Sequence, residues 1–261
     1  MTSSIHTELF GALPVDRFAD DPVVMLPGRS TADLAPDIGA GLAELAADFD
    51  DLGDDRWLQT EYVFRKRRFS LFAADTAERR IEKLEHRAFY QEAEVNPYAG
   101  GFERKFEPLA ERTTRNPFLH QLMWDVLAVL PEARVSAARH WEIGVHLLRI
   151  VALPDKPGYP APEGMHHDGH AFTSISLINR VNVAGGRSLF ADLDRVVYRK
   201  LELEAPIDTV VFEDPRCLHD VTPVTVADGA TVATRDVCGF SLNPLPVESR
   251  SDLPAAAGQA R

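Results

Sequence analysis

Residues 165–170 read MHHDGH, and residues 215–220 read PRCLHD. The first stretch places His166 two positions before Asp168, and the second supplies a distant histidine, His219. Side chains at alternate positions of an extended segment point to the same side, so His166 and Asp168 can bind one metal ion together. Two histidines and one carboxylate on one face of an ion, with other positions open, are diagnostic of non-haem Fe(II) sites. The two stretches therefore predict an iron centre with His166, Asp168 and His219 as ligands.

Neighbouring histidines offer an alternative ligand set. Asp168 and His170 are also two positions apart, and His167 adds another imidazole. A lone His-x-Asp pair is a weak signal in a chain with 9 histidines and 40 acidic residues. The short β-rich runs between His166 and His219 strengthen it, because a jelly roll can bring such distant segments together. For His167 and His170 we expect a supporting role or an ordinary polar loop position.

Longer stretches around these motifs resemble a bacterial Fe(II)/2-oxoglutarate dioxygenase family that includes L-isoleucine 4-hydroxylase and related free amino-acid hydroxylases. The similar segments are PGYPAPEGMHHDGH (157–170), LINRVNVAGG (177–186), LHDVTPV (218–224) and TRDV (234–237), and more loosely RRF (67–69) and GGFER (100–104). The resemblance covers residues 60–245. It implies a double-stranded β-helix fold, the cofactors Fe(II), 2-oxoglutarate and O2, and hydroxylation of an amino-acid-like substrate. It also places the ligand pair at His166 and Asp168 rather than at His170.

Arg235, downstream of His219, is the candidate ligand for 2-oxoglutarate. A guanidinium presents a planar fork that binds a carboxylate through two hydrogen bonds, which lysine does not. A hairpin turn between the two residues would return Arg235 to the metal, where it would bind the distal carboxylate of the co-substrate. The alternative is an ion pair with Asp236 or Glu213. Arg180 is the second candidate for the same role.

Four residues are candidates for binding the substrate. Arg149 precedes the metal-binding loop, and Arg67 and Arg68 form a basic run, from which we select Arg68; either site could bind a substrate carboxylate. For both, a structural ion pair or an exposed charge is the alternative. Glu142 and His146 share one face of a predicted strand and could line the substrate pocket, although His146 could equally be a core histidine with one hydrogen bond.

Composition excludes several classes of partner. The net charge of −12 argues against nucleic acid, because phosphate binding requires a basic surface. No apolar run approaches the ~18 residues of a membrane span, and the first residues lack the basic and apolar stretches of a secretory signal. Two cysteines, Cys217 and Cys238, make no disulfide framework and suit a reduced cytoplasm, where we expect the protein to reside. The sequence leaves open whether it forms a homodimer.

Periodicity predicts an α+β domain. Apolar residues at helical spacing predict helices at 36–52, 75–91 and 117–130, the last with Asn116 as N-cap and Pro117 at its first position. Alternating patterns predict strands at 141–148, 172–183, 187–192, 195–202, 209–213 and 232–242. We therefore expect one domain over 1–261, with a mainly helical N-terminal third (1–135), a jelly-roll, cupin-like core carrying the iron site (136–246) and a loose tail (247–261).

The iron-site motifs and the family resemblance together imply an enzyme that hydroxylates an unactivated C–H bond of a free, aliphatic L-amino acid and releases succinate and CO2. The carboxylate of Asp168 favours hydroxylation over halogenation, since halogenases need that coordination position for chloride. One alternative is the same chemistry on a carrier-bound or peptidyl substrate. Another is a cupin-like metal-binding or sensor protein without turnover, which would not need Arg235 as a co-substrate clamp. The amino acid, the oxidised carbon and the stereochemistry are left open.

Overall fold

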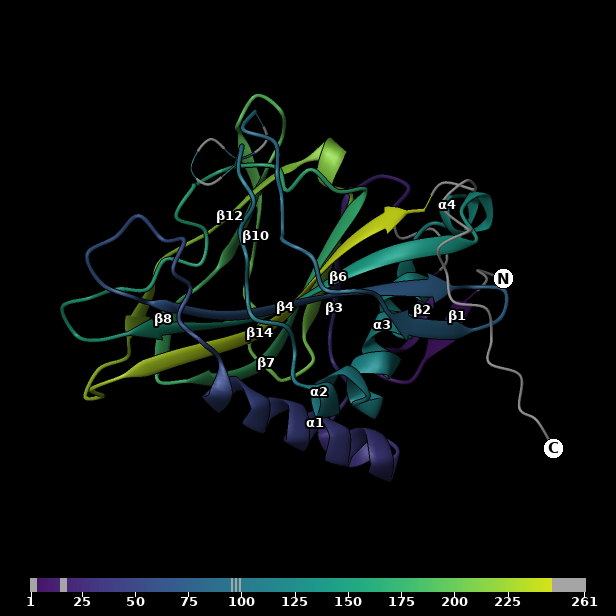
Figure 1. The fold of residues 1–261 in the computed structure, drawn as a ribbon, viewed down its shortest axis with the longest axis horizontal. Helices are drawn as coiled ribbons and strands as arrows, with labels where there is room; N and C mark the ends of the chain where they lie inside the picture. Colours follow the sequence, from purple (N-terminus) through teal and green to yellow (C-terminus); the bar gives the residue numbers. More distant parts are fainter. Residues whose placement is uncertain (1–3, 15–17, 95, 97, 99, 246–261) are drawn as a thin grey trace.

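The computed structural model describes residues 4–14, 18–94, 96, 98 and 100–245 (Figure 1). The predicted tail at 247–261 lies outside the described residues. No helix in the described part of the chain has the length and apolar character needed to cross a membrane.

A seven-stranded antiparallel sheet forms the centre of the protein. Its strands are, in spatial order, β3 (Val23–Leu26), β11 (Thr209–Phe212), β7 (Phe172–Val181), β14 (Ala233–Pro244), β6 (His140–Ala152), β4 (Arg65–Asp75) and β5 (Arg80–Lys83). Separate from it, β1 (Ser4–Thr7) and β2 (Gly11–Pro14) form a hairpin. Many neighbours in the large sheet are far apart in sequence, so the sheet brings distant segments together.

Shorter strands form a second layer. Strand β9 (Ser188–Ala191) pairs with β10 (Val197–Leu201) and β12 (Leu218–Val221), while β8 (Val183–Gly185) pairs with β13 (Val224–Val226). Isolated bridges His166–His219 and Gly158–Val224 attach the segment before β7 to this layer. The result is a mostly β core of two antiparallel layers, consistent with the expected jelly roll.

Helices cover one side of the large sheet (Figure 1). These are α1 (Pro36–Asp48), α2 (Glu111–Thr114) and α3 (Pro117–Val129). The short α4 (Glu132–Ala137) lies at the end of the sheet, and 3-10 turns occur at Thr31–Asp33, Phe49–Asp51 and Asp214–Arg216. The predicted start of α3 is confirmed: the Asn116 side chain accepts a hydrogen bond from Leu119 N at 3.0 Å. The same side chain donates to Gly41 O of α1 at 2.8 Å. At Gly41 a Cβ atom would lie 2.9 Å from Phe118 N, so glycine allows the close approach of α1 to α3.

The helix predicted at 75–91 is wrong. Strand β4 runs to Asp75, a turn follows, and β5 begins at Arg80. The Asp75 carboxylate accepts hydrogen bonds from Ala77 N and Glu78 N, at 3.0 and 3.1 Å, and so stabilises the turn that reverses the chain. A mainly helical N-terminal third is not confirmed either, because strands β1–β5 lie within it and β4 is an interior strand of the large sheet.

Strand periodicity divides the large sheet into two faces. On β14, Cys238 and Leu242 pack in the core with the helices, while Arg235 and Val237 face the opposite side and line a cavity. The same alternation holds on β6 and β4. This cavity lies between the two strand layers, so it is lined by one face of β4, β6, β7 and β14 and, opposite them, by residues of β12 and of the segment before β7.

Candidate active site

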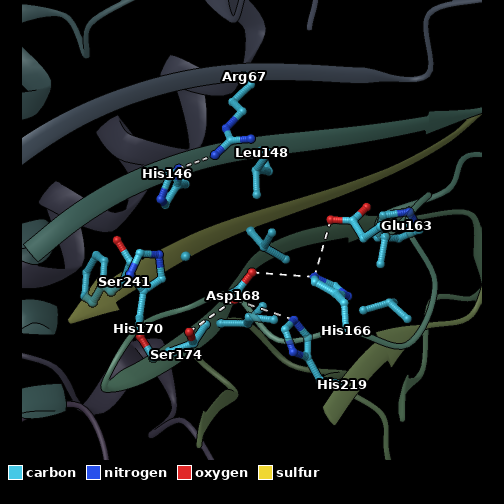
Figure 2. A pocket seen from close by; sticks show the side chains of 18 of the residues that line it. Arg67, His146, Leu148, Glu163, His166, Asp168, His170, Ser174, His219 and Ser241 are labelled. Atoms are coloured by element: carbon cyan, nitrogen blue, oxygen red, sulfur yellow. Dashed lines mark hydrogen bonds and ion pairs between the residues drawn. The ribbon is translucent and has the colours of Figure 1, made fainter. Parts of the chain in front are cut away.

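The three predicted metal ligands converge in the cavity (Figure 2). The backbones of His166 and His219 exchange two hydrogen bonds, at 3.0 and 2.9 Å, which fixes the two imidazoles next to each other. The Asp168 carboxylate lies between them: Oδ1 is 3.5 Å from His166 Nε2, and Oδ2 is 3.6 Å from His219 Nε2. One ligand atom from each residue lies within 4.8 Å of the other two. This is the only such convergent group found among the described residues.

The surrounding hydrogen bonds orient the ligands. His166 Nδ1 donates to Gly164 O at 2.6 Å, which leaves the Nε2 lone pair directed at the shared centre. Thr173 Oγ1 donates to Asp168 Oδ2 at 3.1 Å. The backbone N–H groups of Asp168 and Gly169 donate to the Asp214 carboxylate, each at 2.8 Å, so Asp214 holds the metal-binding loop in place. Sequence reasoning missed Asp214.

The charges of the three ligands are strongly coupled. Burial lowers the pKa of His166, but the hydrogen bond and charge of Asp168 outweigh it and raise that pKa to about 9. Burial and the neighbouring His166 lower the pKa of His219 to about 3. Burial opposes ionisation of Asp168, yet the two histidines hold the pKa of its carboxyl well below the usual range. A divalent metal ion bound to these three side chains would take the place of the proton on His166 as the positive charge beside Asp168, and two imidazoles with one carboxylate fit such an ion.

The rival histidines stand apart from this cluster. His167 Nδ1 interacts with Asp214 O at 2.7 Å, and His170 Nδ1 accepts from Asn243 Nδ2 at 3.0 Å. His170 lines the cavity, but neither side chain belongs to the convergent group. The geometry thus agrees with His166 and Asp168 as the ligand pair.

Arg235 reaches the same cavity and is 1% exposed. Its Nε and Nη2 atoms are buried and have no hydrogen-bond partner among the described residues. Burial lowers its pKa to about 10, with a contribution from Arg180. The backbone at Gly186 adopts φ +70°, and a Cβ atom there would lie 3.1 Å from Arg235 Cδ, so glycine leaves room for the arginine. A buried, unpaired guanidinium fits the carboxylate of a small-molecule ligand.

The residues considered as alternatives, Asp236 and Glu213 as partners of Arg235 and Arg180 in its place, all bind other groups. Asp236 points to the other face of β14 and binds Arg149 through two hydrogen bonds, at 2.7 and 2.8 Å. Glu213 forms ion pairs with Arg134 and Arg216. Arg180 binds Glu202 and donates to Gly185 O at 3.1 Å, and it does not line the cavity. Arg235 is therefore the better placed of the two arginines for a ligand carboxylate.

Two of the four substrate candidates lie away from the cavity. Arg149 follows the cavity-facing Leu148 on β6 and so points to the helix side, where it binds Asp236 and Asp50. Arg68 is likewise on the helix side of β4 and donates to Asp51 O at 3.0 Å. Side chains alternate between the two faces of a β-strand, and Arg68 and Arg149 are each one position away from a residue that faces the cavity.

The other two candidates lie nearer the site. His146 lines the metal cavity, and its Nδ1 is 2.6 Å from Arg67 Nη2. Burial and the charge of Arg67 hold its pKa well below the usual value, so the ring is neutral. Glu142 shares that strand face as expected, but it lines an adjoining cavity and pairs with Arg87.

Sequence reasoning missed several residues that line the metal cavity. The charged or polar ones include Arg65, Gln91, Arg104 and Glu163, and Arg67 lines the cavity in place of its selected neighbour Arg68. Once β4 is recognised as a strand, alternation from Arg68 identifies Arg67. No comparable local signal marks Arg104 or Gln91, which lie in the irregular segment after β5.

Comparison with known proteins agrees with this geometry. A family model described as 2OG-Fe dioxygenase matches residues 46–241. The chain belongs to the 2OG-Fe dioxygenase family. Members use Fe(II), 2-oxoglutarate and O2, so the cofactors expected from the sequence are confirmed, as is the resemblance to this family.

Two curated relatives act on isoleucine or its derivative, by their names. The chain is 32% identical to 3(1)-hydroxy-L-isoleucine 4-dioxygenase of Pantoea ananatis (strain AJ13355) over 151 residues, 57% of this chain and 61% of the relative. It is 27% identical to L-isoleucine-4-hydroxylase of Bacillus thuringiensis over 151 residues, 57% of this chain and 62% of that protein. The matches thus span about three fifths of each relative's length.

Solved structures show the same fold. A bsmA homologue from Methylobium petroleophilum PM1 superposes with a TM-score of 0.74 at 26% identity, over 88% of this chain and 91% of that chain. IDO from Bacillus thuringiensis gives a TM-score of 0.70 at 20% identity, over 89% and 94% of the two chains.

Proposed function

We propose that this dioxygenase hydroxylates an unactivated C–H bond of a free, aliphatic L-amino acid and releases succinate and CO2. The observation that carries the proposal is that one cavity holds both a His-Asp-His cluster and Arg235, whose buried Nε and Nη2 atoms have no hydrogen-bond partner among the described residues. The names of the two curated relatives support an amino-acid substrate.

On this proposal His166, Asp168 and His219 hold the iron. Bound iron would supply the chemistry by which O2 oxidises the substrate C–H to C–OH and 2-oxoglutarate to succinate and CO2, with one oxygen atom going to each. Arg235 binds the distal carboxylate of 2-oxoglutarate through its unpaired Nε and Nη2 atoms. Most residues that line the cavity are buried, and a buried setting strengthens these charged contacts.

The function is tested by a screen of the twenty amino acids. Purified protein is incubated with Fe(II), ascorbate and 2-oxoglutarate, succinate is quantified, and products are analysed by mass spectrometry. We expect at least one aliphatic amino acid to gain one oxygen atom, with one succinate formed for each hydroxylation. If only carrier-tethered or peptidyl amino acids gain oxygen, the free-amino-acid proposal is wrong and the oxygenase chemistry stands. A protein that forms no succinate with any of these substrates would instead be a metal-binding or sensor protein.

A further inference from the structure

Four arginines line the metal cavity, and three of them lack a carboxylate partner. Arg65 binds Asp55, with Nε 2.8 Å from Oδ2. Arg67, Arg104 and Arg235 form no ion pair with any carboxylate in the described part of the chain, although all three are buried. A buried, uncompensated cation costs several kcal/mol, so such groups mark places where a ligand supplies the missing negative charge. The distal carboxylate of 2-oxoglutarate accounts for Arg235 alone.

The Arg67 guanidinium packs between aromatic rings, and one of its nitrogen atoms makes no hydrogen bond within the described chain. Its guanidinium carbon lies 4.1 Å from the ring centre of Phe106 and 5.1 Å from that of Phe89. Nη2 binds His146, and Nε is buried without a partner among the described residues. Burial lowers the pKa of Arg67 to about 9. Figure 2 shows this side chain reaching from β4 toward the cavity, above Asp168.

Arg104 has the same character and is tied to the metal-binding loop. Its Nη2 donates to Gln91 Oε1, while Nε is buried without a partner in the described chain. Gln91 Nε2 in turn donates to Asp168 O at 2.9 Å. Arg104 also lies over the Phe89 ring, at 4.9 Å from its centre, so Phe89 contacts both Arg67 and Arg104. The two guanidiniums thus belong to one rigid group beside the metal ligands.

The positions of the strands separate this group from the co-substrate clamp. Arg67 on β4 is registered with Leu148 of β6, whereas Arg235 on β14 is registered with Ile150. Strand β6 therefore lies between the two arginines, and neighbouring strands are about 4.8 Å apart. Their backbones are consequently about 10 Å apart, which leaves room for two carboxylates from two different molecules.

Glu163 provides the opposite charge. Glu163 and Asp168 are the only acidic residues that line the cavity in the described part of the chain, and Asp168 is assigned to the metal. The Glu163 carboxylate lies 3.3 Å from His166 Nε2 and forms no ion pair with Arg67 or Arg104. Figure 2 shows it on the His166 side of the cavity. A small zwitterion could therefore contact a guanidinium with one end and Glu163 with the other.

We propose that Arg67 and Arg104 bind the α-carboxylate of the amino-acid substrate and that Glu163 binds its α-ammonium group. This assignment rests on the proposed function and deepens it, because it explains how a free α-amino acid would be selected. It replaces Arg68 and Arg149, which point away from the cavity. A substrate whose α-carboxylate is joined to a carrier or a peptide would lack the charge that Arg67 and Arg104 require.

The test compares an amino acid that the wild-type enzyme hydroxylates with its α-carboxamide, which keeps the side chain and ammonium but lacks the carboxylate charge. We expect Arg67→Met and Arg104→Met to raise KM for the amino acid at least about thirtyfold, since truncating one partner of a buried charge pair has effects of this size. Turnover of the carboxamide and the KM for 2-oxoglutarate should stay within about threefold, so the preference for acid over amide is lost. Lys66→Met is the matched control, because Lys66 is adjacent on β4, lies outside the cavity and is 40% exposed.

Glu163 is tested with the analogue that lacks the α-amino group. Wild-type enzyme should prefer the amino acid over this analogue, and Glu163→Gln should remove the preference while the bound iron remains at one per chain. The ratio of activities on two substrates of the same variant does not depend on the fraction of folded protein. The comparison is therefore valid even for a variant that is partly unfolded. Arg67→Lys, which keeps the charge, should retain part of the preference for acid over amide.

Three results would overturn the assignment. The first is an unchanged acid-to-amide ratio in both arginine variants, and the second is a raised KM for 2-oxoglutarate with an unchanged KM for the amino acid. The third is an unchanged amino preference in Glu163→Gln. A wild-type enzyme that converts no free amino acid gives a different result, because it contradicts the proposed function itself.

Discussion

At the scale of single residues, the most informative atoms are buried donors without a partner. His219 Nδ1 and the Nε atoms of Arg67, Arg104 and Arg235 belong to this set in the described chain. Folded proteins bond nearly all of their buried polar groups, so each exception needs a physical explanation. For the three arginines, a ligand carboxylate in the shared cavity is that explanation.

The first residue-scale prediction concerns the co-substrate. Arg235→Ala should raise KM for 2-oxoglutarate at least about thirtyfold, because a truncated, buried charge pair loses on the order of 2–5 kcal/mol. Initial rates of succinate formation against 2-oxoglutarate concentration measure this effect. Arg180→Ala is the comparison: Arg180 is bound to Glu202 outside the cavity, so its KM for 2-oxoglutarate should change little. The opposite pattern, an impaired Arg180→Ala and a normal Arg235→Ala, would transfer the role to Arg180.

At the scale of helices and strands, the sequence predicted the elements with clear caps or strict alternation. Asn116 and Pro117 identified the start of α3, and the alternating pattern identified β6 and β14. The segment at 75–91 was misassigned because its charged residues suited an exposed helix, whereas the Asp75 turn ends β4 there. This error had a consequence at the site: without β4 as a strand, the alternation of Arg67 and Arg68 had no meaning.

The element-scale prediction concerns the joint between α1 and α3. Asn116→Ala should lower the free energy of unfolding by about 1–3 kcal/mol, because it removes the N-cap of α3 and the buried hydrogen bond that Asn116 donates to Gly41 O of α1. Denaturant unfolding of the two proteins measures the difference. Ser30→Ala is the control, since Ser30 caps only an exposed 3-10 turn through a 3.4 Å contact with Ala32 N. Its effect should stay below about 0.5 kcal/mol. Equal losses in the two variants would contradict the role given to Asn116.

At the scale of the whole molecule, the site is assembled from segments that are far apart in the chain. The convergence of His166, Asp168 and His219 could be predicted because they lie in two short motifs, and a jelly roll brings such motifs together. The roles of Gln91, Arg104 and Glu163 could not be predicted, nor could Arg67 be chosen over Arg68, because their approach depends on the strand order of the large sheet and on an irregular segment. The alternation of residues in the sequence predicts which side chains share one face of a strand, but it does not predict which strands lie next to each other in the sheet.

This assembly should make stability depend on the ligands of the site. A ligand that binds only the folded state at 100 times its Kd stabilises it by about 2.7 kcal/mol, which for a chain of this size raises Tm by roughly 5–10 °C. Under anaerobic conditions we expect Fe(II) to raise Tm and 2-oxoglutarate to raise it further, and a chelator to reverse both increments. His219→Ala should lose both, Arg235→Ala only the second, and His170→Ala neither. If His170→Ala loses the metal increment while His219→Ala keeps it, the ligand set moves to the rival pair of Asp168 and His170, because Tm then reports which imidazole binds the iron.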